Sequence, residues 1–320
     1  GLGDVYKRQM LLFAVRSQTM IAYLLFALCS LFFSVALSVF AMIVLKLSGG
    51  SMSGSGIHYQ GLFLYSLVIG VGGALISLML SKVIAKFSMG VRIVSEPQNI
   101  AERFLVDEIS RMCVRIGIKV PEIGIFESDQ INAFATGPSK NNSLVAVSTA
   151  LLEQMSADEA RAVLAHELGH VKNGDMVWMS IINGVANSIA MFGSLIFSRL
   201  IVGYIFDRSD SGAAVACRLI IELILQIALG CFAMIFVMSF SRYREYKADA
   251  FAAELVGQRS MVLALERLDL NRFTDESMPS SMKAFGISGG KRSLSSKAGI
   301  FSSHPTIQER VEALNGGSYA

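Results

Sequence analysis

Charged residues are scarce in this chain of 320 residues. Asp, Glu, Lys and Arg together make up 17% of it, hydrophobic residues make up 53%, and the mean hydropathy is +0.53. This balance argues against an ordinary water-soluble protein and favours a membrane protein. The net charge is only +3 and the basic residues are spread along the chain, so we expect no nucleic acid partner.

Cysteine is also rare, with only Cys29, Cys113, Cys217 and Cys231 in the whole chain. Their spacing is not typical of a disulfide framework or of a zinc site built from cysteines. We therefore interpret them as packing residues.

Histidine is as rare as cysteine, but two of the four histidines share the motif H-E-x-x-H, formed by His166, Glu167 and His170. Residues four apart lie on one face of a helix, so both imidazoles can bind one zinc ion. Glu167 follows the first histidine, where its carboxylate can take a proton from a water molecule at the zinc. Such strings also arise by chance on ordinary amphipathic helices, so the surrounding sequence has to support this interpretation.

The residues around the motif predict one helix. Ser156 and Glu159 have the spacing of a capping box, which starts a helix near Ala157. Asn173 and Gly174 form a natural helix stop. The motif is therefore expected well inside a helix, with apolar neighbours that keep bulk water away.

A catalytic zinc ion usually takes three protein ligands and water, so a third ligand has to come from another segment. His304 is one candidate. Glu245 is the stronger one, because it belongs to an E-x-x-x-D pattern in which Asp249 can accept the free ring N–H of a zinc histidine. The alternative for Glu245 is a solvated charge among neighbouring basic residues. We expect one Zn²⁺ per chain, bound by His166, His170 and Glu245.

Four apolar segments are long enough to cross a membrane. A helical hairpin of the last two would bring the H-E-x-x-H motif and Glu245 together at its base. A soluble two-helix excursion is the alternative to this hairpin. The expected spans are about 18–46 and 61–82 in an N-terminal membrane region, 10–82, and about 176–200 and 217–240 in a membrane hairpin, 176–240.

Positive charges flank the first two spans on one side only. Arg16 precedes the first span, and Lys82, Lys86 and Arg92 follow the second span. The loop 48–60 between the two spans has no Lys or Arg. By the positive-inside rule, both termini and the catalytic segments face the cytoplasm. Residues 1–9 do not look like part of the fold, and we interpret them as a cloning or sequence-assembly leader.

The region 83–175 is expected to be a cytoplasmic part with a small sheet before the zinc helix. An edge strand can hold an extended peptide by main-chain hydrogen bonds, so a substrate contact is expected either at Asn132, Ala133, Phe134 and Ala135 or at 144–148. The alternative is that both are simply core strands. Strands are expected at 122–127, 131–136 and 144–148, with a turn at 138–142.

The last region, 241–320, is expected to be cytoplasmic and to carry the third zinc ligand, a flexible segment at 271–303 and a C-terminal helix. His304 and Arg310 are candidates for stabilising the oxyanion or contacting the substrate. His304 has a structural alternative as a loop residue at the entry to the last helix.

In the order and spacing of these motifs, the chain resembles the membrane-bound heat-shock proteases of the M48 zinc metallopeptidase family over about three quarters of its length. The resemblance implies a mainly α fold with a small β-sheet, in which four transmembrane helices join a cytoplasmic gluzincin-type zinc metalloprotease domain. It also implies Glu167 as the base. The matching segments are 132–137, 143–149, 166–176, 241–249 and 303–305, followed by Arg310.

This resemblance further implies a zinc metalloendopeptidase that cleaves misfolded or damaged membrane proteins in protein quality control and stress response. The implied location is the bacterial cytoplasmic (inner) membrane. The implied partners are those substrates, the lipid bilayer and other membrane quality-control proteases.

Two other functions share some of these features. A CaaX-type prenyl-protein endoprotease has the same zinc motifs, but that branch builds a larger multi-helix chamber than four spans provide. A non-catalytic zinc-containing membrane scaffold is the other alternative, although Glu167 would serve no purpose in a closed structural site.

Overall fold

The computed structural model describes residues 59–206, 211–271 and 304–316. The leader 1–9, the first expected span at 18–46 and all but the first residue of the segment 271–303 lie outside the described residues. The elements, in chain order, are α2 (Tyr59–Met89), β1 (Arg92–Ile93), α3 (Ile100–Ile116), β2 (Glu122–Phe126), β3 (Ala133–Ser139), β4 (Asn142–Ser148), α4 (Thr149–Gln154), α5 (Ala157–Asn173), α6 (Asp175–Ile205), α7 (Gly212–Val256), α8 (Gln258–Asn271) and α9 (Ile307–Gly316).

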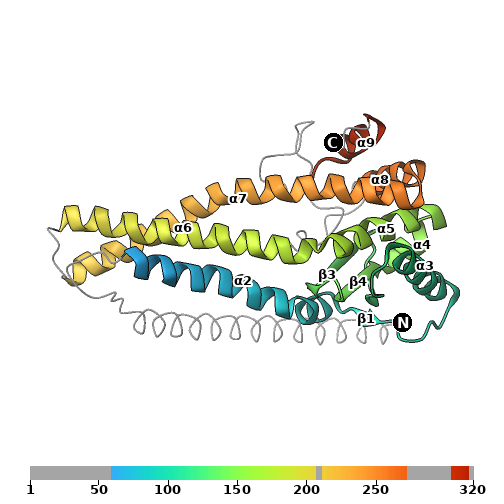
Figure 1. The fold of residues 1–320 in the computed structure, drawn as a ribbon, viewed down its shortest axis with the longest axis horizontal. Coiled ribbons are helices and arrows are strands. Elements are labelled where there is room, and N and C mark those ends of the chain that lie inside the picture. The colour runs from blue at the N-terminus through green and yellow to red at the C-terminus, as the bar shows by residue number, and fades with distance from the viewer. Residues whose placement is uncertain (1–58, 207–210, 272–303, 317–320) are drawn as a thin grey trace, which may run out of the picture.

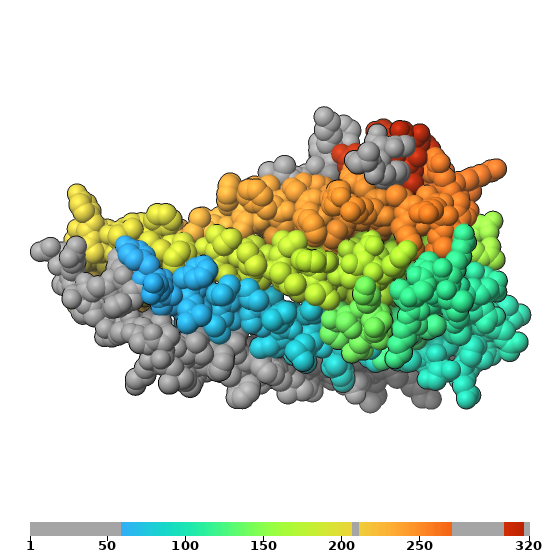
Figure 2. Space-filling model, in the orientation of Figure 1, coloured from blue at the N-terminus to red at the C-terminus, as the bar shows by residue number. Residues whose placement is uncertain are grey.

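Three long helices, α2, α6 and α7, lie side by side and extend away from the sheet and the shorter helices (Figure 1). They have 31, 31 and 45 residues, and each is long and apolar enough to cross a membrane. Three of the four expected spans are thus confirmed as helices of suitable length and composition. Their outer surfaces form most of the elongated body seen in Figure 2.

Helix α7 continues well beyond the expected end of the last span at residue 240. It runs without a break to Val256, and Gly257, which has a φ of 103°, ends it. Between Phe240 and Gly257 the sequence contains Arg, Glu, Lys and Ala, which are good helix formers, and no Gly or Pro. The change at residue 240 is therefore one of composition only, and the same helix carries Glu245 and Asp249.

Small residues bring α2 and α6 close together. A Cβ added to Gly70 would lie 2.7 Å from the main-chain N of Ser188 and 2.8 Å from the main-chain O of Gly184. Such contacts require small side chains, as is typical of helix pairs in membranes. Between α6 and α7, the hydroxyl of Ser194 donates a hydrogen bond of 2.8 Å to Oε1 of Gln226.

The sheet has four strands in the order β1-β2-β4-β3. Strand β4 pairs with β2 in parallel and with β3 in antiparallel register, so within the described residues β3 is an edge strand and β4 is central. The alternative expectation of an edge at 144–148 is therefore wrong. The turn expected at 138–142 is shorter in the structure, because β3 continues to Ser139. Pro138 lies where the register between β3 and β4 shifts, and an irregular edge position of this kind tolerates a residue without an N–H group.

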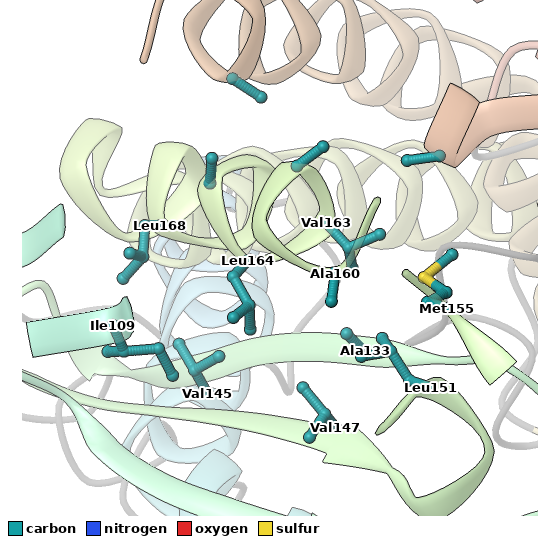
Figure 3. Close-up of a cluster of buried hydrophobic side chains, with 14 of the residues drawn as sticks. Ile109, Ala133, Val145, Val147, Leu151, Met155, Ala160, Val163, Leu164 and Leu168 are labelled. Atoms are coloured by element: carbon teal, nitrogen blue, oxygen red, sulfur yellow. The ribbon is translucent and has the colours of Figure 1, made fainter. Parts of the chain in front are cut away.

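The core lies between α5 and the sheet. In Figure 3, Leu164 and Leu168 of α5 point toward Val145 and Val147 of β4. The alternate side chains of β4 face the opposite side of the sheet, where a smaller cluster includes Ala85 of α2. The sheet thus has α5 on one face and the end of a membrane helix on the other.

Ion pairs fix the end of α2 to the sheet. Nζ of Lys82 lies 2.7 Å and Nζ of Lys86 lies 2.6 Å from the carboxylate of Glu122 at the start of β2. The two ammonium groups hold the pKa of Glu122 below its usual range. The membrane helices and the sheet domain are therefore joined by polar contacts as well as by apolar packing.

Candidate metal centre

Helix α5 begins and ends where the sequence predicts. The main-chain N–H of Glu159 donates to Oγ of Ser156, and the main-chain N–H of Ser156 donates to Oε2 of Glu159 over 2.7 Å. Gly174, with a φ of 69°, closes the helix in the left-handed conformation. The capping box and the helix stop are both confirmed, and His166 and His170 are buried within the helix.

Gly169 lets α7 approach α5 beside the two histidines. A Cβ at this position would lie 2.9 Å from Cδ1 of Phe251 and 3.5 Å from Cα of Ala248. Any larger side chain would push the two helices apart or displace the Phe251 ring. The glycine of the motif therefore sets the distance at which α7 presents Glu245 to the histidines.

The nitrogen and oxygen atoms expected to bind zinc lie together. Nε2 of His166 is 3.2 Å from Nε2 of His170, and these nitrogens are 3.6 Å and 3.4 Å from the two carboxylate oxygens of Glu245. Ligands at zinc–nitrogen distances near 2.0–2.1 Å in a tetrahedron are separated by about 3.3 Å. The spacing therefore fits one zinc ion bound by these three side chains, all of which are buried.

A further observation favours a cation at this place. Oε2 of Glu245 is buried and accepts no hydrogen bond of good geometry within the described residues, although Nδ1 of His304 lies 3.0 Å and Nη1 of Arg310 lies 3.8 Å from it. A buried carboxylate oxygen without a hydrogen-bond donor is costly unless a positive charge compensates it. The guanidinium of Arg310 supplies part of that charge, and a divalent cation between the three side chains would bind the oxygen directly.

His166 is held by a carboxylate and an arginine. Its Nδ1 lies 2.9 Å from Oδ1 of Asp249, where the sequence predicts this partner, so its Nε2 remains available for a metal. Arg310 of α9 forms a two-pronged ion pair with Asp249, with Nε 2.7 Å from Oδ2. Both side chains are essentially inaccessible to solvent. Arg310 thus lies behind the ligands, engaged with Asp249.

His170 is held by a residue to which we assigned no role from the sequence. Its Nδ1 lies 2.6 Å from Oδ2 of Asp175, the first residue of α6. Nε of Arg244 lies 3.3 Å from the same oxygen. The sequence held two signals for it: Asp175 follows the Gly174 helix stop directly, and it lies in one of the segments that carry the family resemblance.

Among the described residues, His304 lies beside the three predicted zinc ligands but does not belong to that group. Its Nδ1 is 3.0 Å from Oε2 of Glu245, and its side chain is 14% exposed. The two segments that the sequence leaves unconnected, around residues 245 and 304, are thus brought together.

Charges shift the pKa values of the cluster in a consistent direction. Burial by itself would raise the pKa of Glu245, but the neighbouring His304, His166 and His170 side chains hold it well below its usual range. Burial also opposes protonation of His170, yet hydrogen bonds to Asp175 and Glu245 raise its pKa to about 10. Negative charge therefore dominates around the imidazoles, which suits a site for a divalent cation.

The expected substrate strand lies at the edge of the sheet. The side chains of Ala133 and Phe134 are buried in the two apolar clusters on opposite faces of the sheet, and Ala135 packs against the larger one. The main chain of Asn132 is paired with Ser148 through its N–H and its carbonyl. Any contact of this strand with a peptide would therefore be made by main-chain groups other than those of Asn132.

Comparisons with known proteins agree with this geometry. The model of peptidase family M48 matches residues 100–317. A protein named Protease HtpX from Acinetobacter baumannii (strain AYE) is 45% identical over 286 residues, which cover 88% of this chain and 95% of that protein. A second Protease HtpX, from Alcanivorax borkumensis, is 43% identical over 290 residues, again covering 88% and 95%.

The fold also resembles a solved structure, the crystal structure of S. mikatae Ste24p. The TM-score is 0.58 at 20% identity, and the match covers 80% of this chain and 58% of that chain. At this identity the likeness shows the fold alone. The present chain spans little more than half the length of Ste24p.

Proposed function

The chain belongs to peptidase family M48, and from this membership we propose that it is a membrane-embedded, zinc-dependent endopeptidase. The observation that carries the proposal is the buried group of His166, His170 and Glu245, whose donor atoms have the separations of a tetrahedral zinc site. Glu167 follows the first histidine in the same buried stretch of α5, with 3% of its surface exposed.

The residues of the site divide the chemistry between them. When bound, the zinc ion would polarise the scissile carbonyl and lower the pKa of a water molecule toward neutrality. A carboxylate oxygen of Glu167 accepts the proton of the attacking water and then donates it to the departing amine nitrogen, which restores the carboxylate. His166, His170 and Glu245 hold their donor atoms in place because all three are buried and packed between α5 and α7.

The two late residues take different roles in this proposal. Arg310 is 1% exposed and its guanidinium is engaged with Asp249, so we assign it to holding Asp249 and, through it, His166. His304 is more exposed and lies against Glu245, so it remains the candidate for contacting the oxyanion or the substrate. The edge strand β3 is the proposed holder of an extended peptide.

The proposed substrates are misfolded or damaged membrane proteins, cleaved on the cytoplasmic side of the bacterial cytoplasmic membrane in quality control and stress response. Helix α6 begins at Asp175, five residues after His170, so the site lies at the mouth of the membrane hairpin. A chain that leaves the bilayer would be within reach there. The bacterial relatives named Protease HtpX support the protease activity on which this proposal depends.

The test compares wild type, Glu167→Gln and Glu254→Gln in detergent, with casein, a destabilised membrane protein and a prenylated C-terminal peptide as substrates. Glu254 is an exposed residue of α7 and serves as the matched control. Glu167→Gln is expected to lower cleavage by about 10² to 10⁴-fold while the zinc content stays unchanged, since only the proton acceptor is lost. Chelation of zinc should stop cleavage by the wild type.

Each alternative has its own result in this experiment. Cleavage that persists in Glu167→Gln would show that the proposed base is wrong. A zinc-loaded wild type that cuts nothing would support the scaffold function, and cleavage of the prenylated peptide alone would support the CaaX-type function.

A further inference from the structure

The two histidines of the site are supported in parallel ways. Nδ1 of His166 contacts Asp249, which accepts two hydrogen bonds from Arg310, and Nδ1 of His170 contacts Asp175, whose carboxylate forms an ion pair with Arg244. In both cases the carboxylate fixes the ring by one nitrogen and leaves Nε2 directed at the metal group.

The support of His170 comes from the membrane hairpin. Asp175 is the first residue of α6, and Gly174 turns the chain so that the Asp175 carboxylate reaches back to α5. Arg244 belongs to α7 and stands one residue before Glu245. The three helices therefore meet at a single carboxylate.

Arg244 contacts Asp175 at two places. Its Nε lies 3.3 Å from Oδ2, the oxygen that contacts His170, and its Nη1 donates over 3.3 Å to the main-chain carbonyl of Asp175. The two side chains are only 13% and 8% exposed, so solvent screens the interaction weakly. Nε makes no hydrogen bond within the described residues, so the guanidinium acts on the carboxylate as an ion pair, while the bond from Nη1 keeps Arg244 beside the oxygen that contacts His170.

We propose that Asp175 and Arg244 are positioning residues that make the zinc affinity of the site depend on the packing of α6 against α7. Asp175 orients the His170 ring, and Arg244 holds Asp175 while its own helix delivers Glu245. The membrane hairpin is then part of the metal site as well as its anchor. This inference rests on the proposed zinc site and adds residues that the H-E-x-x-H motif does not contain.

The experiment measures zinc affinity by equilibrium competition with a chelator, using the full chain in detergent micelles. Asp175→Asn keeps the size of the side chain but removes the charge, and should weaken zinc binding about 10 to 100-fold. Asp158→Asn is the matched control, because Asp158 also lies in the first turn of its helix but contacts Arg161 instead of a histidine. It should leave the affinity unchanged within about twofold, which separates positioning from a general helix-dipole effect.

Arg244 gives a second, independent measurement. Arg244→Gln should weaken zinc binding less than Asp175→Asn does, and Arg244→Lys should recover part of the loss. The double variant Asp175→Asn/Arg244→Gln should be no weaker than Asp175→Asn alone, because Arg244 acts through that carboxylate. A purely structural role would instead give additive losses.

Several results would overturn the inference. These are an Asp175→Asn affinity within twofold of wild type, an equal loss in Asp158→Asn, and additive losses in the double variant. If Asp175→Asn fails to fold, Asp175→Glu replaces it in the experiment, because glutamate keeps the charge but moves the carboxylate. Weaker zinc binding by Asp175→Glu would support the positioning role, and an unchanged zinc affinity would refute it. A wild type that binds zinc without cleaving would overturn the proposed function only, and leaves this comparison intact.

Discussion

Replacing Gly169 by alanine tests whether the glycine of the motif sets the distance between α5 and α7. The added Cβ would lie 2.9 Å from Cδ1 of Phe251, whereas ordinary carbon contacts are about 3.5–4.0 Å apart. The ring or the helix must therefore move by at least about 0.6 Å. Because α7 also carries Glu245, the movement should separate the metal ligands and weaken zinc binding.

The effect on stability combines two terms of opposite sign. Overpacking a tight contact costs about 1–3 kcal/mol, and alanine in place of glycine within a helix gains about 0.5–1 kcal/mol. We expect a net loss of about 1 kcal/mol for Gly169→Ala. For a chain of 320 residues that corresponds to a midpoint of thermal unfolding lower by roughly 1–2 °C.

The assay is thermal unfolding in detergent together with chelator competition for zinc. Gly230→Ala is the matched control, because a Cβ at this helical glycine of α7 meets nothing within 4 Å. In a Phe251→Ala background, Gly169→Ala should cost nothing, because the ring that it displaces is gone. If Gly169→Ala raises the midpoint as much as Gly230→Ala does and zinc binding is unchanged, the reasoning about helix distance is refuted.

Two more predictions concern buried and acidic groups. Arg310→Met should lower the free energy of unfolding by about 3–5 kcal/mol, because it leaves the Asp249 carboxylate buried without its cation. Adding Asp249→Asn to the same chain should recover part of this loss. A change below about 1 kcal/mol in denaturant unfolding of Arg310→Met would contradict the prediction. The hydrogen bond that the Glu102 carboxylate accepts from the main-chain N–H of Gln98 lowers the pKa of Glu102 in the folded protein. The contribution of Glu102 to stability is therefore full above its unfolded pKa of about 4.3 and is lost as the pH falls through its lower folded pKa. Glu102→Gln should therefore flatten the acid-unfolding profile below about pH 5, and a superimposable profile would contradict the assignment.

The arrangement of the site gives the membrane hairpin a chemical role. Helix α6 supplies Asp175, and the extension of α7 beyond the apolar span supplies Glu245 and Asp249. A version of this protein without the hairpin would lose the proposed third ligand and both carboxylates that contact the histidines. In this proposal, metal binding and membrane anchoring depend on the same two helices.

Local patterns in the sequence were sufficient for much of the site. The capping box at Ser156 and the stop at Gly174 predicted the bounds of α5, since these signals depend on neighbouring residues only. The spacing of the motif placed His166 and His170 on one face of that helix. Hydrophobic length predicted the spans for the same reason, because crossing a bilayer needs a minimum run of apolar residues.

The tertiary structure decided which distant groups meet. Only the packing of α9 against α7 showed that Arg310 is occupied by Asp249, and only the turn at Gly174 brought Asp175 to His170. The order of the strands, with β3 at the edge, likewise depends on pairing between segments. Sequence determined the ligand types and their helices, because those follow from local spacing, whereas the partners that orient the ligands depend on contacts between residues far apart in the chain.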